Sequence, residues 1–362
     1  MRAYEFGLIT YDEYRRYYRR KYDELYVKKI ESRYSQNQKK KVVRKKVNPV
    51  IIHNVYQCMK DCCSLSEHHR LGLIRDRKIS LERIEQDYFT CPTNWRQKDT
   101  IIARIKEKYP EYTDEILMNI PGFFYDKKRG KLSFTGHKGL GILIRNSDSR
   151  IVAIQIRKDT IQEGDSRYIW FSSSFATYNP DEYNGGNGCG SPKDVCYPQM
   201  LKKHTLCITE GRFKSEKLTE SGNISISVQG VTSWHGIEET IKHMNGIHNV
   251  FIFFDADILG KHVLFIQSEK MIQKIQDEFP GLYIRYAFWS KKNGKGIDDC
   301  IIAGNISKVK YYEVKRAAEI CNDAYTHALG EYHVGNLREL KQERAKEFED
   351  YLQILTESML GL

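Results

Sequence analysis

The chain of 362 residues lacks the features that mark several large classes of protein. It has no apolar run near the roughly 18 residues that a membrane-spanning helix needs, and its basic N-terminal segment lacks the apolar centre of a targeting peptide. The absence of a GxxxxGKS or GxxxxGKT pattern excludes a P-loop. No CxxC or CxxH pair with a matching second half occurs among its nine cysteines, so we expect no zinc. Their odd number, without a secretory signal, favours reduced thiols in a cytoplasm.

Positive charge is concentrated at the N-terminus. Residues 1–47 hold fifteen Lys or Arg against six Asp or Glu, which is +9 of the total charge of +11. A helical pattern over residues 10–35 places tyrosines in one stripe and arginines beside it. The segment is either an amphipathic helix that docks on the rest of the chain or an arm that binds single-stranded nucleic acid by stacking and by phosphate contacts. The second alternative assigns nucleic-acid contacts to Arg15, Arg16, Arg19, Arg20 and Tyr18.

Four short motifs in the second half of the chain follow or end apolar runs. They are LCITEG at 206–211, VQGV at 228–231, VFIFFDADILG at 250–260 and KGIDD at 295–299. Runs that are continuous rather than alternating are typical of strands buried on both faces of a parallel sheet. The carboxyl ends of such strands form the edge where ligands and metals bind. The sequence therefore predicts that the acidic residues of these motifs converge at one sheet edge.

The Asp255-Ala256-Asp257 motif indicates a particular chemistry. In an extended segment, side chains alternate, so its two carboxylates share one side. Like charges held that close raise each other's pKa unless a cation lies between them, and oxygen ligands suit a hard divalent ion. We expect Mg²⁺ or Mn²⁺ here.

At these motifs the chain resembles the Toprim family, the catalytic domain shared by DnaG-type primases, type IA and II topoisomerases and OLD-type nucleases. Within that family it is similar to the Toprim-like primase proteins of plasmids, phages and conjugative elements, where an EGxxK start, a DaD centre and a KGIDD end recur. The resemblance implies that Glu210, Asp255 and Asp257 are catalytic. It implies metal ligands at the same three residues and at Asp298.

Two positions depart from the pattern of DnaG-type primases. Those enzymes carry an acid four residues after the glutamate, where this chain has Lys214, and a DPD-like motif where this chain has Gly296-Ile297-Asp298. Both differences remove a negative charge. The number of bound ions is therefore left open.

A second resemblance lies upstream. Residues 139–159 predict a hairpin of two apolar strands joined by the polar turn 146–149, followed by RYIWFSSS at 167–174. This is similar to the segment before the Toprim unit in DnaG-type primases, where an arginine-bearing hairpin lines the groove for nucleotide and template. The alternative for any one arginine is a solvated strand end. The nucleotide and template contacts that we expect are Arg145, Arg157, Lys131, Lys138 and Lys214.

The remaining segments predict helices, at 50–62, 64–75, 80–87 and 99–108, and two more within 305–362. The fold class is therefore α/β: a Rossmann-like Toprim parallel sheet, preceded by a helical region and an α+β DnaG-like half, with a basic N-terminal helix and a helical C-terminal tail. The predicted domains are 1–47 (basic arm), 48–120 (helical lead-in), 121–200 (nucleotide- and template-binding half), 201–305 (Toprim catalytic domain) and 306–362 (helical tail). The tail is either a lid on the sheet or a docking surface for a replicative helicase.

These motifs and resemblances together lead us to expect a DNA primase of the prokaryotic cytoplasm. It would use nucleoside triphosphates to make short RNA primers on a single-stranded DNA template during replication of a mobile element such as a plasmid. We expect no membrane partner. Two alternatives stay open: a Toprim metal-dependent nuclease, and a non-catalytic factor that binds or loads on single-stranded DNA. The hairpin with its arginines favours the polymerase.

Overall fold

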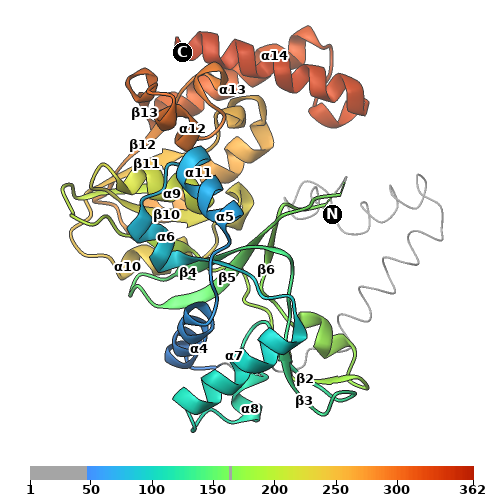
Figure 1. Ribbon diagram of the computed structural model, residues 1–362. Helices are drawn as coiled ribbons and strands as arrows, with labels where there is room; N and C mark the ends of the chain where they lie inside the picture. The colour runs from blue at the N-terminus through green and yellow to red at the C-terminus, as the bar shows by residue number, and fades with distance from the viewer. Residues whose placement is uncertain (1–46, 163–164) are drawn as a thin grey trace. The chain divides into compact units, whose positions relative to one another are not determined.

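A six-stranded sheet forms the centre of the second half of the chain in the computed structural model, which describes residues 47–162 and 165–362 (Figure 1). Its strand order is β13-β12-β11-β9-β10-β8. The four inner strands run parallel and coincide with the apolar runs of the sequence: β9 (Thr205–Glu210), β10 (Ile224–Val228), β11 (Asn249–Phe253) and β12 (Tyr283–Phe288). The prediction of a buried parallel sheet is confirmed.

Short antiparallel strands close both edges of this sheet. β13 (Lys310–Glu313) pairs with β12, and β8 (Asp194–Cys196) pairs with β10. By pairing, β8 belongs to this sheet, although its residues precede the domain boundary predicted at residue 201.

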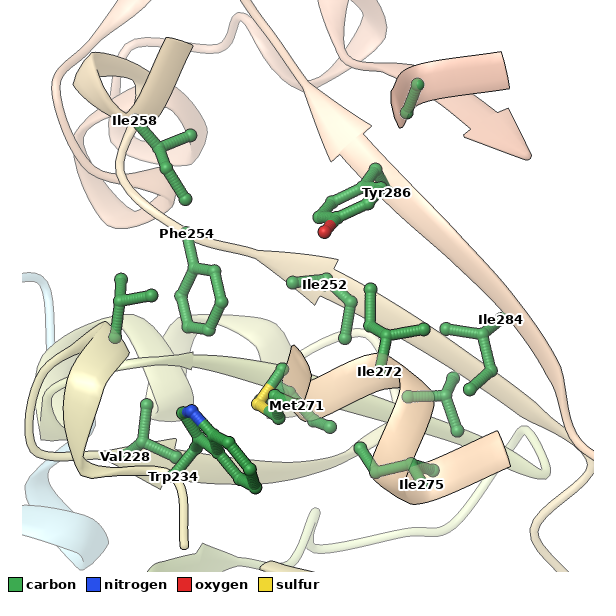
Figure 2. Close-up of a cluster of buried hydrophobic side chains, with 14 of the residues drawn as sticks. Val228, Trp234, Ile252, Phe254, Ile258, Met271, Ile272, Ile275, Ile284 and Tyr286 are labelled. Atoms are coloured by element: carbon green, nitrogen blue, oxygen red, sulfur yellow. The ribbon is translucent and has the colours of Figure 1, made fainter. Parts of the chain in front are cut away.

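Apolar side chains cover both faces of the sheet. On one face, Trp234 and Met271 pack against Ile252 and Tyr286 (Figure 2). On the other face, Cys207, Phe253 and Ala287 pack with Trp289 and Ile297. Burial on both faces explains the continuous apolar runs of β9 and β11, whereas β10 alternates isoleucine with serine and buries both serines. The helices of this half are α9 (Arg212–Thr219), α10 (Ile237–Lys242), α11 (His262–Glu278), α12 (Ile297–Ile302), α13 (Val314–Glu331) and α14 (Gln342–Leu360).

The predicted hairpin is the middle of a second, antiparallel sheet. β4 (Gly139–Arg145) and β5 (Ile151–Lys158) pair along their length, with Ser149 in the left-handed conformation at the turn (φ 61°). β1 (Tyr88–Thr90) and β6 (Tyr168–Trp170) complete the order β1-β4-β5-β6. A third, small sheet contains β2 (Phe123–Asp126), β3 (Lys131–Phe134) and β7 (Tyr183–Asn184).

The helical lead-in is present with shifted boundaries. Its helices are α4 (Pro49–Asp61), α5 (Glu67–Leu71), the π-helix Gly72–Asp76, α6 (Leu81–Asp87), α7 (Trp95–Lys108) and α8 (Asp114–Leu117). The helix expected from residue 64 begins at Glu67, because Ser66 caps it: the Ser66 hydroxyl accepts from the His69 N–H. α7 begins at Trp95 rather than Asp99 because Asn94 caps it.

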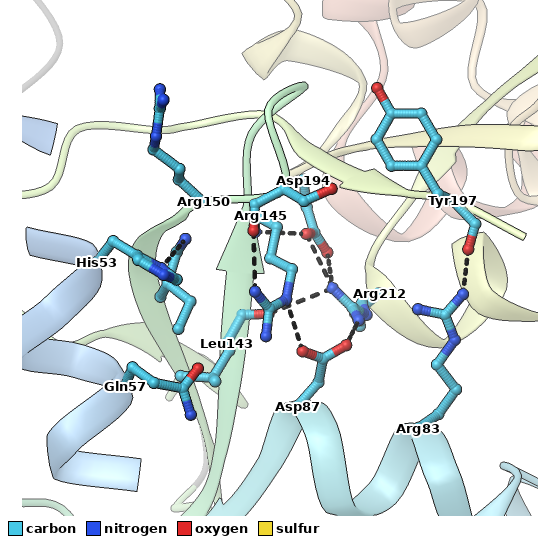
Figure 3. Close-up of polar contacts among 12 residues, drawn as sticks. His53, Gln57, Arg83, Asp87, Leu143, Arg145, Arg150, Asp194, Tyr197 and Arg212 are labelled. Atoms are coloured by element: carbon cyan, nitrogen blue, oxygen red, sulfur yellow. Dashed lines mark hydrogen bonds and ion pairs between the residues drawn. The ribbon is translucent and has the colours of Figure 1, made fainter. Parts of the chain in front are cut away.

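A buried polar network ties α6, β4, β8 and α9 together (Figure 3). Arg212 in α9 forms ion pairs with Asp87, with Asp194 at 3.0 Å and with Glu216 at 2.7 Å, and all four side chains are buried. Arg145 adds a 2.8 Å pair between its Nε and Asp87. The network joins the lead-in and both large sheets, so it fixes the walls between which the candidate site lies. No helix in the described ranges is both long and apolar enough to cross a bilayer.

Candidate active site

The carboxyl ends of three adjacent parallel strands carry acidic residues. Glu210 ends β9, Asp255 follows β11, and Asp298 lies in α12, after β12. All three line a cavity of about 540 Å³. The opposite wall comes from the antiparallel sheet, through Gln155 and Trp170. The acidic motifs therefore meet at one edge of the sheet, and the hairpin faces them.

Asp257 lies beside this group, and its charge adds to the raised pKa of Glu210. Its Oδ2 lies 2.7 Å from the Lys261 Nζ and 3.5 Å from the Lys295 Nζ, and it does not line the cavity. Burial alone would raise the pKa of Asp257, but the two lysines lower it. The expectation that Asp255 and Asp257 share one side is wrong, because a 3-10 turn (Ala256–Gly260) begins directly after Asp255 and ends the extended segment.

Lys214 enters the group of carboxylates. Its Nζ lies 2.5 Å from the Asp255 Oδ1. Burial opposes its charge, yet the contact with Asp255, together with nearby Glu210, raises the pKa of Lys214. The residue that stands where DnaG-type primases carry an acid therefore places an ammonium ion among the predicted metal ligands.

Gly296 is the second departure from that pattern, and it is coupled to Lys214. A Cβ atom at Gly296 would lie 2.3 Å from the Asp298 Oδ1 and 2.6 Å from the Lys214 Cε. Any other residue at this position would have to displace one of these side chains. The glycine thus permits the lysine and Asp298 to approach each other.

Sequence reasoning did not identify Arg77 as a site residue. This residue follows the π-helix, and its NH1 group donates to the Asp298 Oδ2 at 2.9 Å, while its guanidinium lies 4.9 Å from the ring centroid of Phe213. The two partners of the ion pair are 221 residues apart, so no local pattern relates them. π-Helices occur frequently at functional sites, and this one directs a cation from the lead-in to the sheet edge.

The buried carboxyls have altered acidity. Burial, and next the charge of Asp255, raises the pKa of Glu210, although Lys214 opposes the shift. Burial also raises the pKa of Asp298, with a further contribution from Asp299, against the effects of Lys214 and Arg77. Glu210 and Asp298 are therefore carboxyls whose negative charge is incompletely compensated by their surroundings, a property of acid–base residues and of sites for a cation.

The carboxylates of the candidate site have the right chemistry for a divalent ion, but their present positions do not form a complete binding site. In the described part of the chain, no three His, Cys, Asp or Glu side chains lie where they could hold one metal ion together. Glu210 and Asp255 supply carboxylate oxygens, the donors that Mg²⁺ and Mn²⁺ prefer, and the charge of Asp255 contributes to the raised pKa of Glu210. An ion beside this pair would need Lys214 to turn away from Asp255.

A second cavity of about 530 Å³ adjoins the first and shares Arg77 and Arg167 with it. It is lined by further cations, including Arg157 and Lys158 from the end of β5. The Nε of Arg157 is buried without a hydrogen-bond partner among the residues that the structure describes. Positive side chains therefore continue from the carboxylates into a neighbouring recess.

The other predicted contact residues lie elsewhere. Arg145 belongs to the buried network with Asp87, is 11% exposed and does not line either cavity. Lys131 pairs with Asp99 on α7, and Lys138 is exposed just before β4. The prediction that Arg145 faces the site is corrected because the buried Asp87 carboxylate binds its guanidinium. The arm residues Arg15, Arg16, Arg19, Arg20 and Tyr18 lie outside the described residues.

Solved structures of similar fold are bacterial primases. The RNA polymerase domain of Mycobacterium tuberculosis primase DnaG superposes with a TM-score of 0.53 at 13% identity, over 77% of this chain and 87% of that chain. The same domain in complex with a double-stranded DNA oligomer with a 6-nucleotide overhang gives 0.52 at 12% identity, over 85% and 97%. The chain has the fold of a DnaG primase catalytic core.

A third structure and the sequence comparisons add detail. The zinc-binding and RNA polymerase domains of Aquifex aeolicus primase give a TM-score of 0.51 at 11% identity, over 87% of this chain and 76% of that chain. Residues 197–307 match the model of a family described as a domain of unknown function, DUF3854. No curated protein sequence matches the chain. The DUF3854 match covers the region that contains all four acidic residues of the candidate site.

Proposed function

We propose that the protein is a DNA primase, which joins ribonucleotides into short primers on a single-stranded DNA template. The observation that carries this proposal is the meeting of Glu210, Asp255 and Asp298 at one cavity, walled on the far side by the antiparallel sheet. The DnaG-type fold supports it. The resemblance of the acidic motifs to Toprim-like primases of plasmids and other mobile elements makes replication of such an element the setting we propose.

The chain's own residues would supply position and charge. Phosphoryl transfer depends mainly on these, because little covalent chemistry falls to the protein. Lys214, Arg77 and Arg167 would hold the triphosphate of the incoming nucleotide through charge-assisted hydrogen bonds. Glu210, with its raised pKa, would accept the proton of the primer's 3′-hydroxyl as that oxygen attacks the α-phosphorus and pyrophosphate leaves.

We further propose Mg²⁺ or Mn²⁺ as cofactor, held by Asp255 and Glu210 with Asp298 and Asp257 nearby. When bound, such an ion would neutralise charge on the phosphates. A replicative helicase, docked through the C-terminal helices, is the partner we propose for delivery to the template. The nine free thiols suit the reducing cytoplasm in which a prokaryotic primase would work.

A second candidate function has its own observation. This candidate is a non-catalytic factor that binds single-stranded DNA. The 2.5 Å contact between Lys214 and Asp255 places a protein cation where an active Toprim enzyme would need a metal, and a protein that only binds DNA would tolerate this arrangement. A nuclease is the third outcome, because the same carboxylates would serve it.

One assay separates these functions. The full chain is incubated with single-stranded DNA, labelled ribonucleotides and Mg²⁺ or Mn²⁺. We expect short labelled RNA products that Glu210→Gln and Asp255→Asn abolish. Cleaved template instead of new product would identify a nuclease, and a mobility shift without either product would identify a binding factor. Product formation that survives in both variants would refute the assigned site.

A further inference from the structure

An exposed tryptophan surrounded by cations lies outside both cavities. Trp95, the first residue of α7, is 55% exposed, whereas the other three tryptophans are buried or half-buried. The ring centroid lies 5.2 Å from the Arg96 Cζ, 5.6 Å from the Arg129 Cζ and 5.6 Å from the Lys131 Nζ. A large ring that stays in water adds little to a core, so its position calls for another explanation.

Stabilisation by the neighbouring cations does not account for the exposed position of Trp95. Exposed cation–π pairs contribute about 0.5–1 kcal/mol each. Among these cations, Arg129 and Lys131 share one carboxylate, Asp99, and the group keeps a net positive charge. A structural ion-pair network would be balanced. An indole face combined with excess positive charge is instead the composition of sites that stack bases and hold phosphates.

A line of cations leads from Trp95 toward the active site. One turn along α7, the Lys98 Nζ lies against Gly136, at 2.7 Å from where a Cβ would stand. His137 and Lys138 follow, and the burial of His137, with the charges of Lys158 and Lys98, lowers its pKa. The Lys138 carbonyl accepts from the Asp159 N–H at 3.3 Å, which places this segment beside the end of β5.

The line then reaches the cavities. Gly139, directly after Lys138, is the cross-strand partner of Lys158. Lys158 and Arg157 line the second cavity together with Asp76 and Asp159, Lys158 pairs with Asp165 at 2.6 Å, and Arg167 belongs to both cavities. Positive side chains therefore connect α7 with the carboxylates through the end of the hairpin sheet.

We propose that Trp95 is a base-stacking platform for single-stranded nucleic acid, at the outer end of a cationic track that reaches the active site through Lys98, Lys158 and Arg167. The proposal rests on the proposed function, since the strand held here would be the template. Stacking on an aromatic side chain is worth about 1–3 kcal/mol per base, and the lysines and arginines would hold the phosphates without regard to sequence.

The test measures binding of a labelled oligothymidylate to the full chain by fluorescence anisotropy, without nucleotides or divalent ions. We expect Trp95→Ala to weaken binding by about 5- to 150-fold, the range that follows from that stacking energy. Trp95→Phe should retain most of the affinity because it keeps a ring. Arg129→Gln should instead reduce the dependence of log Kd on log salt concentration by about 0.7, since one phosphate contact is lost.

The controls separate stacking from charge and from misfolding. Tyr283→Ala removes another exposed ring, 41% exposed with the Arg285 guanidinium 4.7 Å from its centroid, on a different sheet, and should leave affinity unchanged. An oligomer of equal length that lacks bases should bind the native chain and Trp95→Ala equally. Unchanged affinity in Trp95→Ala, or an equal loss on the abasic oligomer or on duplex DNA, would overturn the platform. Because the binding measurement needs no catalysis, it tests the role of Trp95 independently of primer synthesis. Base stacking on Trp95 can be confirmed in a protein that makes no primers, and it can be refuted in one that does.

Discussion

At the scale of single residues, Lys214 is the group that most distinguishes this site. It holds a positive charge 2.5 Å from an Asp255 oxygen, in a place where DnaG-type primases carry a negative one. The lysine therefore competes with any divalent ion for the same carboxylates. Opposite charges about 4 Å apart near a protein surface interact with on the order of 4 kcal/mol, so this competition is strong.

Removal of that ammonium should strengthen metal binding. We expect Lys214→Met to bind Mn²⁺ at least about tenfold more tightly than the native chain, because the repulsion between the lysine ammonium and the metal ion is lost. The measurement is a Mn²⁺ titration followed by electron paramagnetic resonance. Lys274→Met, at an exposed position of α11, serves as the control and should leave affinity unchanged. Equal affinity in Lys214→Met would show that the lysine leaves room for the ion.

The buried arginines give a second residue-scale prediction. Arg212→Met leaves the carboxylates of Asp87, Asp194 and Glu216 without their shared cation, so we expect a loss of about 3–5 kcal/mol in the free energy of unfolding. Arg145→Gln should also lower stability, by less, and leave template affinity intact. Urea unfolding and oligonucleotide binding measure the two effects. A loss of affinity with unchanged stability in Arg145→Gln would restore this residue to the binding surface.

Sequence reasoning found the residues whose position follows from local pattern. Glu210 and Asp255 end or follow continuous apolar strands, Asp298 comes after a third strand-like stretch, and the topology of a parallel sheet then brings them together. Arg77 could not be found in this way, since it meets Asp298 across 221 residues. Arg145 was assigned to the site because it ends a hairpin strand, and only tertiary contact with Asp87 reveals its structural role.

At the scale of elements, α14 supports the candidate site through hydrogen bonds to the turn that follows Asp255. Gln353 accepts a hydrogen bond from the Gly260 N–H at 2.9 Å and donates one to the Ala256 carbonyl at 3.0 Å. These two groups lie in the 3-10 turn that follows Asp255. The C-terminal helix therefore fixes the backbone of the acidic loop, a role that its own charged sequence does not indicate.

Loss of this clamp should be measurable. Gln353→Ala leaves buried backbone groups unpaired, so we expect a loss of about 1–3 kcal/mol in the free energy of unfolding, together with lower primer synthesis. Gln342→Ala, at the exposed start of the same helix, is the matched control and should change neither. Urea unfolding and the primer assay give the two readouts. Native behaviour in Gln353→Ala would mean that α14 does not hold the loop.

The elements themselves were largely predictable, and their ends were not. Strands buried on both faces are recognisable as continuous apolar runs, and polar residues between the two strands of the hairpin 139–159 indicate its turn. Where several capping residues lie close together, as with Ser64 and Ser66, the choice depends on tertiary contacts: the Ser64 carbonyl accepts from the Thr90 N–H, so the helix starts later.

At the scale of the whole chain, charge is divided between two parts. Residues 1–47 carry +9 and the remainder about +2, although that remainder contains the track from Trp95 to the carboxylates. The basic segment would then supply general affinity for nucleic acid, and the track would supply direction toward the site.

Deletion of residues 1–47 tests this division. We expect weaker binding of single-stranded DNA with a smaller salt dependence, because fewer counterions are released. Selection of the start site on the template should also change if the arm replaces a zinc-binding module. Anisotropy at increasing salt concentration and sequencing of the primers measure these effects. Unchanged affinity and unchanged start sites in the truncated chain would remove any such role from the segment.

The contact between Gly296 and Lys214 also constrains how this site can change by mutation. An aspartate at position 296 would collide with Lys214 while the lysine remains, and an acid at position 214 alone would crowd negative charge onto Asp255 and Glu210. Each single step toward the acidic pattern of DnaG-type primases is unfavourable; the double change removes the collision with Lys214, and a bound divalent ion would then have to offset the added negative charge. We therefore expect positions 214 and 296 to co-vary among relatives, with either a lysine and a glycine or two acids at the pair.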